Sequence, residues 1–102
     1  MFLVQILLPL KDNDGNALPE ALFETVVKTL TETFGGVTAY TRTAAEGRWK
    51  EAGANTQADD IVVIEVMARN VDRPWWQGYR AELERSFRQK RVIVRAHRIQ
   101  LI

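Results

Sequence analysis

Cysteine is absent from the 102-residue chain, and histidine occurs only once. Without cysteine the chain can form no disulfide, thiol nucleophile, zinc-thiolate site or iron–sulfur cluster, and one histidine cannot supply a multi-histidine metal centre. We therefore expect neither a metal ion nor a cofactor. The chain is too short for two hydrophobic cores, so residues 1–102 are expected to form a single domain.

Long apolar runs are also missing. The apolar start of the chain spans only nine residues, is interrupted by Gln5, and has neither a positively charged leader nor a small-residue cleavage pattern. It is too short to cross a membrane and does not have the organisation of a signal peptide. Together with the lack of cysteine, this predicts a cytoplasmic protein with no membrane partner.

The net charge of +1 hides an uneven distribution of charge. Residues 1–70 hold six Lys or Arg against ten Asp or Glu, whereas residues 71–102 hold eight against three. A basic third of a chain can form an anion or nucleic-acid surface, but segments of opposite charge also attract one another within a fold or across an oligomer. We favour the second interpretation.

Four segments have the composition and periodicity of β-strands. Residues 2–10 are apolar on both faces, and Ile61–Ala68 is rich in β-branched residues, so both are predicted to be central strands. Residues 37–43 and 91–98 supply the other two. A turn at residues 45–47 can begin a short return strand at Arg48–Lys50, which leaves an extra hairpin open as an option.

Two segments have the periodicity of amphipathic helices. The first begins near Pro19 and ends at Gly35 and Gly36, since paired glycines after an apolar stripe are typical of a helix terminus. The second is predicted to begin at Asp72, which can cap it, with Pro74 in the first turn. Its apolar stripe consists of Trp76, Tyr79, Leu83 and Phe87.

The order of elements is therefore strand, helix, strand, strand, helix, strand. This order predicts an α+β, ferredoxin-like βαββαβ fold, with an antiparallel sheet, both helices on one face, and the first and third strands in the centre. Because side chains alternate along a strand, the apolar even positions of the third and fourth strands are predicted to face the helices. In the fourth strand these positions are Val92, Val94 and Ala96.

The opposite, open face of the sheet then carries the odd positions. It combines aliphatic side chains such as Leu3, Leu7, Val63 and Ile93 with a set of polar ones. If the second strand keeps the same register, this polar set consists of Gln5, Tyr40, Arg42, Glu65, Arg95 and His97. A monomer seldom leaves so large an apolar surface in water, so we expect a homodimer that packs through this face.

Candidate site residues follow from this polar set. Glu65 beside Arg95 or Arg42 has the arrangement of a general base held near a cation, and histidine is the residue type whose unperturbed pKa lies near neutrality, so Glu65 and His97 are the catalytic candidates. The alternative for Glu65 and its arginine neighbour is a buried ion pair that fixes the register of the sheet and of the dimer. The candidates for ligand binding are Arg95, Tyr40, Arg42, Gln5 and Trp49, where arginine offers a planar fork of donors and tryptophan a large amphipathic ring.

Nucleic acid fits this surface poorly. Recognition of RNA by a sheet of this type needs aromatic side chains on the central strands, on which bases stack. The central strands instead expose Gln5, Glu65 and aliphatic residues, and a carboxylate at this position repels phosphate. We therefore expect no nucleic-acid partner.

Several short segments resemble a known group of proteins. They are FGGVTAY at Phe34–Tyr40, GRW at Gly47–Trp49, DDIVVIEV at Asp59–Val66 and the basic final strand. With the order of elements, they resemble small ferredoxin-like proteins of the dimeric α/β-barrel superfamily, in particular an uncharacterised branch that pairs an FGG-T segment with a downstream G-x-W. The superfamily includes cofactor-free monooxygenases, lactone isomerases and haem-degrading enzymes, so the resemblance implies a dimer with a cavity but no single reaction.

Two functional hypotheses remain open. The protein binds a small molecule, or is a cofactor-independent enzyme, acting on an organic anion or aromatic compound in a dimer cavity. Alternatively, it is a non-catalytic oligomerisation or interaction module whose polar sheet residues are structural. Whether the chain is an enzyme is not determined by the sequence.

Overall fold

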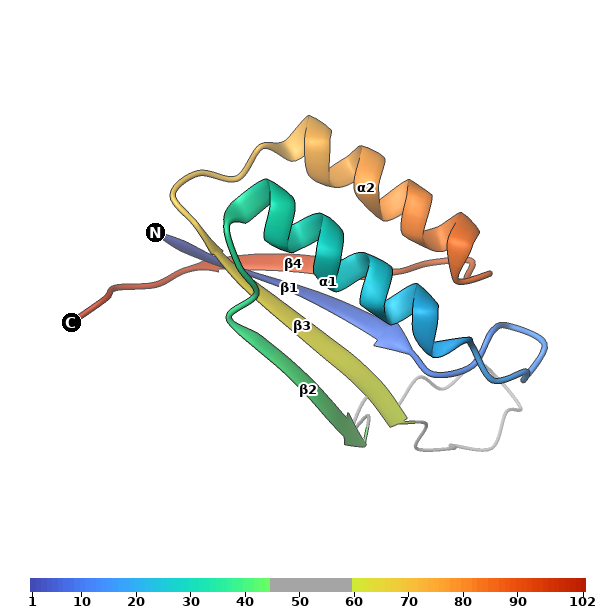
Figure 1. Ribbon diagram of the computed structural model, residues 1–102. Coiled ribbons are helices and arrows are strands. Elements are labelled where there is room, and N and C mark those ends of the chain that lie inside the picture. Colours follow the sequence, from blue (N-terminus) through green and yellow to red (C-terminus); the bar gives the residue numbers. More distant parts are fainter. Residues whose placement is uncertain (45–59) are drawn as a thin grey trace, which may run out of the picture.

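The computed structural model describes residues 1–44 and 60–102, which form one sheet and two helices (Figure 1). The predicted hairpin at Arg48–Lys50 and the loop at residues 52–58 lie outside this part of the chain. In chain order, the elements are β1 (Phe2–Pro9), α1 (Glu20–Phe34), β2 (Ala39–Ala44), β3 (Asp60–Ala68), α2 (Arg73–Ser86) and β4 (Ile93–Arg98).

The sheet has the strand order β2-β3-β1-β4, and each pair of neighbours is antiparallel. Both helices lie on one face of the sheet, as Figure 1 shows. The first and third strands are therefore central, which confirms the predicted α+β, ferredoxin-like fold. Within residues 1–44 and 60–102, the opposite face of the sheet carries no helix.

The core lies between the helices and the even positions of the two central strands. These positions are fully buried in both strands, at Val4, Ile6 and Leu8 and at Val62, Ile64 and Val66. The odd positions Gln5 and Glu65 are only half-buried. The predicted assignment of faces is thus confirmed for β1 and β3. Every second side chain of a strand that packs against helices must be apolar, since these side chains all point to the same face.

Local sequence signals set the ends of the helices. Helix α1 ends at Gly35, whose φ of 83° is the left-handed conformation that glycine adopts without steric cost. At the start of α2, the Asp72 side chain accepts a hydrogen bond from the backbone N–H of Trp75, and Pro74 lies in the first turn. Both predicted helix boundaries are therefore confirmed.

An aromatic cluster joins the end of α1 to the start of α2. Phe34 stacks on Trp76 with ring centroids 5.2 Å apart and meets Trp75 edge-on at 5.3 Å. Trp75 also stacks on Tyr79, at 5.1 Å. Adjacent Trp75 and Trp76 thus both pack within the helix layer, and their mutual contacts hold the two helices side by side.

The fourth strand departs from the prediction in two ways. It begins at Ile93 rather than near Arg91, because the backbone N–H of Val92 donates to the Glu84 carboxylate of α2. Its even positions also become progressively less covered: Val92 is buried, Val94 is half-buried and Ala96 is exposed. The prediction that all three meet the helices is therefore wrong for Ala96, because α2 does not cover this end of the strand.

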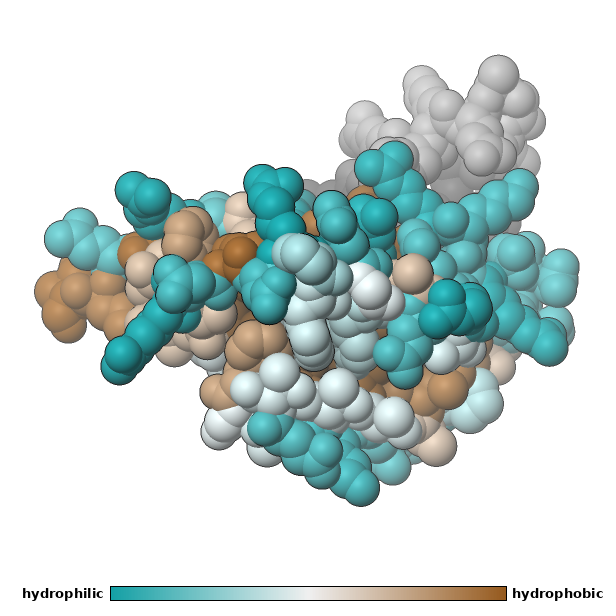
Figure 2. Space-filling model, turned by 90° about the horizontal axis from the view of Figure 1, so that it is seen from above, coloured by the Kyte–Doolittle hydropathy of each residue, from teal (hydrophilic) through white to brown (hydrophobic). Residues whose placement is uncertain are grey.

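The surface of the helix layer is largely hydrophilic, as Figure 2 shows from above. Hydrophobic residues project at the end of the molecule where the C-terminus lies, and here Leu101 is 60% exposed. In the ranges 1–44 and 60–102, neither helix has the length and apolar character needed to span a bilayer.

Candidate functional site

A row of three polar side chains crosses the open face of the sheet. The register pairs Gln5 of β1 with Glu65 of β3 on one side and with Arg95 of β4 on the other. The Gln5 amide Nε2 donates to Glu65 Oε1 at 2.9 Å, and Arg95 Nε donates to Gln5 Oε1 at 2.8 Å. The row Glu65–Gln5–Arg95 is therefore continuous across three strands.

The central amide is oriented by the charges on either side of it. Its NH2 group faces the carboxylate and its carbonyl faces the guanidinium, so each end of the amide dipole meets the opposite charge. Glu65 and Gln5 are half-buried and Arg95 is exposed. Glu65 Oε2 has no hydrogen-bond partner among the described residues, which leaves it available to a ligand or a proton.

Two apolar rows border this polar row. On one side, Leu3 lies between Met67 and His97; on the other, Leu7 lies between Val63 and Ile93. Most of these side chains are half-buried, while Met67 and His97 are exposed. The open face therefore combines a charged strip with aliphatic borders, as the alternation of residues predicted.

His97 lies at the edge of this face. It stands two residues beyond Arg95 on β4, on the same side of the strand, and opposite Leu3 of β1. The structure thus brings four of the predicted site residues together, in two adjacent rows: Gln5, Glu65, Arg95 and His97. The remaining predicted site residue that does not belong to β2 is Trp49, which lies outside the described residues.

Glu65 and Arg95 do not form the direct ion pair that the sequence suggested. Gln5 lies between them and satisfies one atom of each. The reason is the strand order, because β1 separates β3 from β4 and places their side chains two strand spacings apart, about 10 Å. A glutamine in an otherwise apolar strand was the signal for this bridging role.

The predicted placement of Tyr40 and Arg42 on the open face is wrong. The register pairs Tyr40 with Ile64 and Arg42 with Val62, and both partners face the helices. Directly opposed residues of an antiparallel pair share a face, so Tyr40 and Arg42 lie on the helix side. The open-face positions of β2 belong instead to Ala39, Thr41 and Thr43, and the alternation within β2 alone could not reveal this register.

Local contacts agree with this correction. Arg42 Nη2 forms an exposed ion pair with Asp60 Oδ2 at 3.3 Å, across the β2–β3 edge. Burial and the nearby carboxylate of Glu20 in α1 raise the pKa of Tyr40, although the guanidinium of Arg42 opposes this effect. Neither side chain therefore contributes to the row on the open face.

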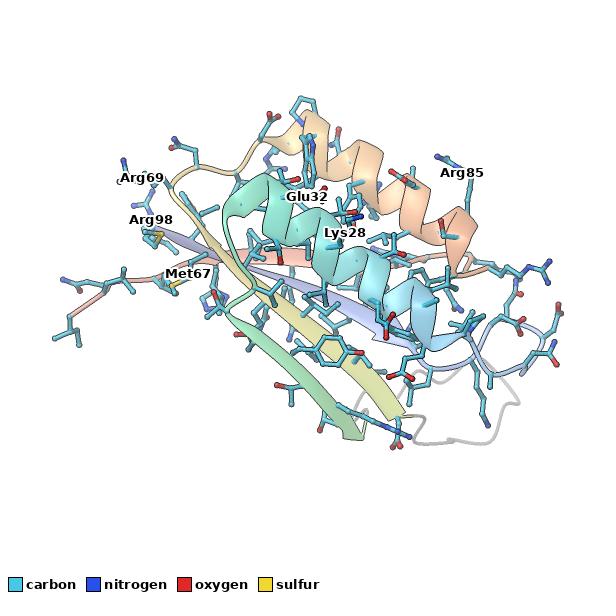
Figure 3. The ribbon with its side chains drawn as sticks, viewed as in Figure 1. Lys28, Glu32, Met67, Arg69, Arg85 and Arg98 are labelled. Carbon is cyan, nitrogen blue, oxygen red and sulfur yellow. The ribbon has the colours of Figure 1, made fainter. Side chains whose placement is uncertain are left out.

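Arg69 and Arg98 add positive charge at one end of the sheet, near Met67, as Figure 3 shows. The Arg98 guanidinium lies over the ring of Phe2, 5.7 Å from its centroid, in a cation–π contact on the helix side. In the described ranges, no three histidine, aspartate or glutamate side chains gather as ligands for a metal ion.

Comparison with protein-family models finds no match, and comparison with curated protein sequences finds none either. Among solved structures, the chain is similar to a phage SAM lyase in complex with S-methyl-5′-thioadenosine, with a TM-score of 0.61 and 16% sequence identity. The match covers 94% of this chain and 79% of the lyase chain. At this identity the likeness concerns the fold, and it agrees with the ferredoxin-like architecture.

Proposed function

We propose that the protein binds a small organic molecule on the open face of its sheet, with the row Glu65–Gln5–Arg95 at the centre of the site. The observation that carries the proposal is this continuous polar row within an aliphatic surface. Aliphatic side chains alone would serve better for apolar packing, because a carboxylate and a guanidinium lose hydration when the face is covered.

The chemistry of the face favours an organic anion or an aromatic compound. Arg95 and the adjacent His97 can hold an anionic group, and the rows around Leu3 and Leu7 can contact a flat ring. The likeness to a lyase that holds an adenine-containing thioether supports this choice, because it shows that a related fold accommodates an aromatic small molecule. A second copy of the chain would cover the face and enclose the ligand.

The same residues can support a reaction. Glu65 keeps one carboxylate oxygen without a partner among the described residues, and can therefore accept a proton. His97 lies on the far side of β1, about two strand spacings away, so a small ligand can lie between them. In this form of the proposal, Glu65 is the general base and His97 carries the proton.

One observation favours the alternative, a non-catalytic interaction module. Gln5 satisfies an atom of Glu65 and an atom of Arg95 at once, so the row can fix the register of three strands without any ligand. In that case the row is structural, and the open face serves only to bind another copy.

Ligand screening by thermal unfolding distinguishes the two functions. A set of aromatic and anionic compounds, including adenosine thioethers, is tested on the native protein and on the double variant Glu65→Leu, Arg95→Leu. We expect at least one compound to raise the Tm of the native protein by several degrees and not that of the double variant. Arg42→Gln, on the opposite side of the sheet, is the matched control and should keep the effect.

Two results would overturn the small-molecule proposal. One is that no compound raises the Tm of the native protein. The other is that the double variant responds as the native protein does, which would mean that the row takes no part in binding. Either result leaves the interaction module as the better interpretation.

A further inference from the structure

A groove on the helix side of the sheet lies between α2 and the end of β4 that this helix leaves uncovered. Its volume is about 220 Å³. Val4, Val94 and Ala96 form its apolar floor, and Trp76 adds an aromatic wall. Since pockets for drug-sized ligands measure roughly 300–1,000 Å³, this groove fits a molecule about the size of a single ring with one substituent.

Positive charge lines the other wall of the groove. Arg73, Gln77 and Arg80 follow one another along α2 at spacings of four and three residues, which places them on one side of the helix. Both arginines are exposed, and neither forms an ion pair within residues 1–44 and 60–102. Arg95 also borders the groove, but its Nε is bonded to Gln5 on the open face.

Among the described residues, no carboxylate lines the groove. Glu82, the nearest to Arg80 in sequence, instead lines a separate hollow beside Tyr79 and Leu83. The next two carboxylates along the chain already accept hydrogen bonds. Asp72 accepts from the backbone N–H of Trp75, and Glu84 accepts from that of Val92. The groove therefore presents two guanidinium groups, with their fork of donors, to whatever enters it. An anionic group is the partner that this arrangement favours.

The aromatic wall holds a further unsatisfied donor. Trp76 is 5% exposed, and its Nε1–H has no hydrogen-bond partner within the described part of the chain. Buried donors are nearly always paired, because an unpaired one loses its hydration without compensation. The side chain that holds this unpaired donor also lines the groove.

We propose that this groove is a second binding site, separate from the open face, for a small organic anion with an apolar body, such as an aryl carboxylate. Arg73 and Arg80 bind the anionic group, while Val94, Ala96 and Trp76 contact the ring. The site lies on the helix side of the sheet, so it stays accessible when a second copy covers the open face.

Benzoate is the probe for this site, with benzamide as its neutral analogue and inorganic phosphate as an anion without an apolar body. Titration of the full chain is followed by amide chemical shifts in the NMR spectrum. We expect saturable shifts at Val94, Ala96 and the first two turns of α2 with benzoate. Binding of benzamide and of phosphate should each be at least tenfold weaker.

Variants of exposed residues test the roles of the two arginines. Arg73→Gln and Arg80→Gln should each weaken benzoate binding about tenfold, and the double variant should abolish it. Arg85→Gln is the matched control, since Arg85 lies on the same helix but does not line the groove (Figure 3). Its affinity for benzoate should equal that of the native protein. Thermal unfolding checks that each variant is folded.

Four results would overturn the proposal. The first is that benzoate causes no saturable shifts at millimolar concentrations. The second is that benzamide binds as tightly as benzoate. The third is that the double variant binds benzoate like the native protein. The fourth is that the benzoate shifts map to Leu7 and Glu65 on the open face rather than to the groove. The fourth result would leave the proposed function of the open face intact.

Discussion

Arg88 is the residue with the least favourable backbone conformation among the described residues. Its φ of 50° lies in the left-handed region, where side chains other than glycine are strained. It follows the C-terminus of α2, where the N–H of Gln89 bonds to the carbonyl of Glu84 and the N–H of Arg88 to that of Arg85. This is the Schellman pattern, which usually places glycine at the position of Arg88.

We therefore expect Arg88→Gly to stabilise the protein by about 0.5–1 kcal/mol. The free energy of unfolding from urea denaturation measures the effect. Gly35→Ala is the opposite control, because Gly35 has a φ of 83° at the end of α1 and an added Cβ strains it. It should lower the stability by about 1 kcal/mol. A loss of stability in Arg88→Gly would mean that the Arg88 side chain contributes more than its strain costs.

Tyr79 makes stability depend on pH above pH 10. Burial raises its pKa to about 12 from 10.0, and a hydrogen bond with Thr29 opposes this effect only in part. Between these values the unfolded chain releases the phenolic proton and the folded chain keeps it, so the stabilisation is complete below pH 10 and is lost as the pH rises toward 12. The expected loss between pH 9 and pH 11 is about 1 kcal/mol.

Urea denaturation of the native protein and of Tyr79→Phe at both pH values measures this loss. Phenylalanine keeps the packing but cannot ionise, so the additional loss in the native protein should disappear in the variant. The contributions of the other ionisable groups are the same in both proteins and cancel in the comparison. Equal pH dependence of the two proteins would show that Tyr79 ionises as readily in the folded state as in the unfolded chain.

At the scale of the elements, α2 depends on its first turn. Asp72 accepts the N–H of Trp75, which would otherwise lack an acceptor at the start of the helix. The same turn carries Trp75 and Trp76, through which α2 packs on Phe34 of α1. The cap therefore holds the aromatic cluster as well as the helix end.

Asp72→Ala is expected to lower the free energy of unfolding by about 1 kcal/mol, since alanine offers no acceptor at the N-cap. Asp72→Asn keeps an acceptor, so it should lower the free energy of unfolding by only about 0.3 kcal/mol. Chemical denaturation followed by tryptophan fluorescence measures both effects. If the two variants lost the same amount, the charge of Asp72 rather than its hydrogen bond would be the stabilising feature.

At the scale of the whole molecule, neither of the two helices that the structure describes covers the open face of the sheet. Its aliphatic rows around Leu3 and Leu7 are the basis for the predicted homodimer. A stable interface of this kind would bury a total of roughly 1,200 Å² or more. Enclosure of the Glu65–Gln5–Arg95 row would follow from such packing.

We expect Val63→Lys and Ile93→Lys each to convert the dimer into a monomer, because the lysine charge would lose its hydration in an apolar contact. Light scattering at several protein concentrations measures the change. Thr33→Lys, an exposed position on α1, is the matched control and should leave the dimer intact. A native protein that stays monomeric at micromolar concentration would contradict the prediction.

Local and periodic properties of the sequence determined most of the fold. The apolar parity of β1 and β3 assigned their faces, because a strand packed against helices must bury alternate side chains. Gly35 and Asp72 marked helix ends. Glycine readily adopts the left-handed conformation that ends a helix, and the aspartate side chain accepts a hydrogen bond from a free backbone N–H at a helix start. From these signals, the position of Glu65, Arg95 and His97 on one open face followed directly.

Only the tertiary structure decided the features that depend on how separate elements meet. The register of β2 against β3 places Tyr40 and Arg42 on the helix side. Pairing between the two strands sets this register, and the alternation of residues within either strand does not reveal it. The bridging role of Gln5 and the groove beside Ala96 likewise depend on strand order and on how far α2 extends over β4. Such long-range geometry arises from packing between segments distant in the chain, whereas periodicity records only which face of each segment is buried.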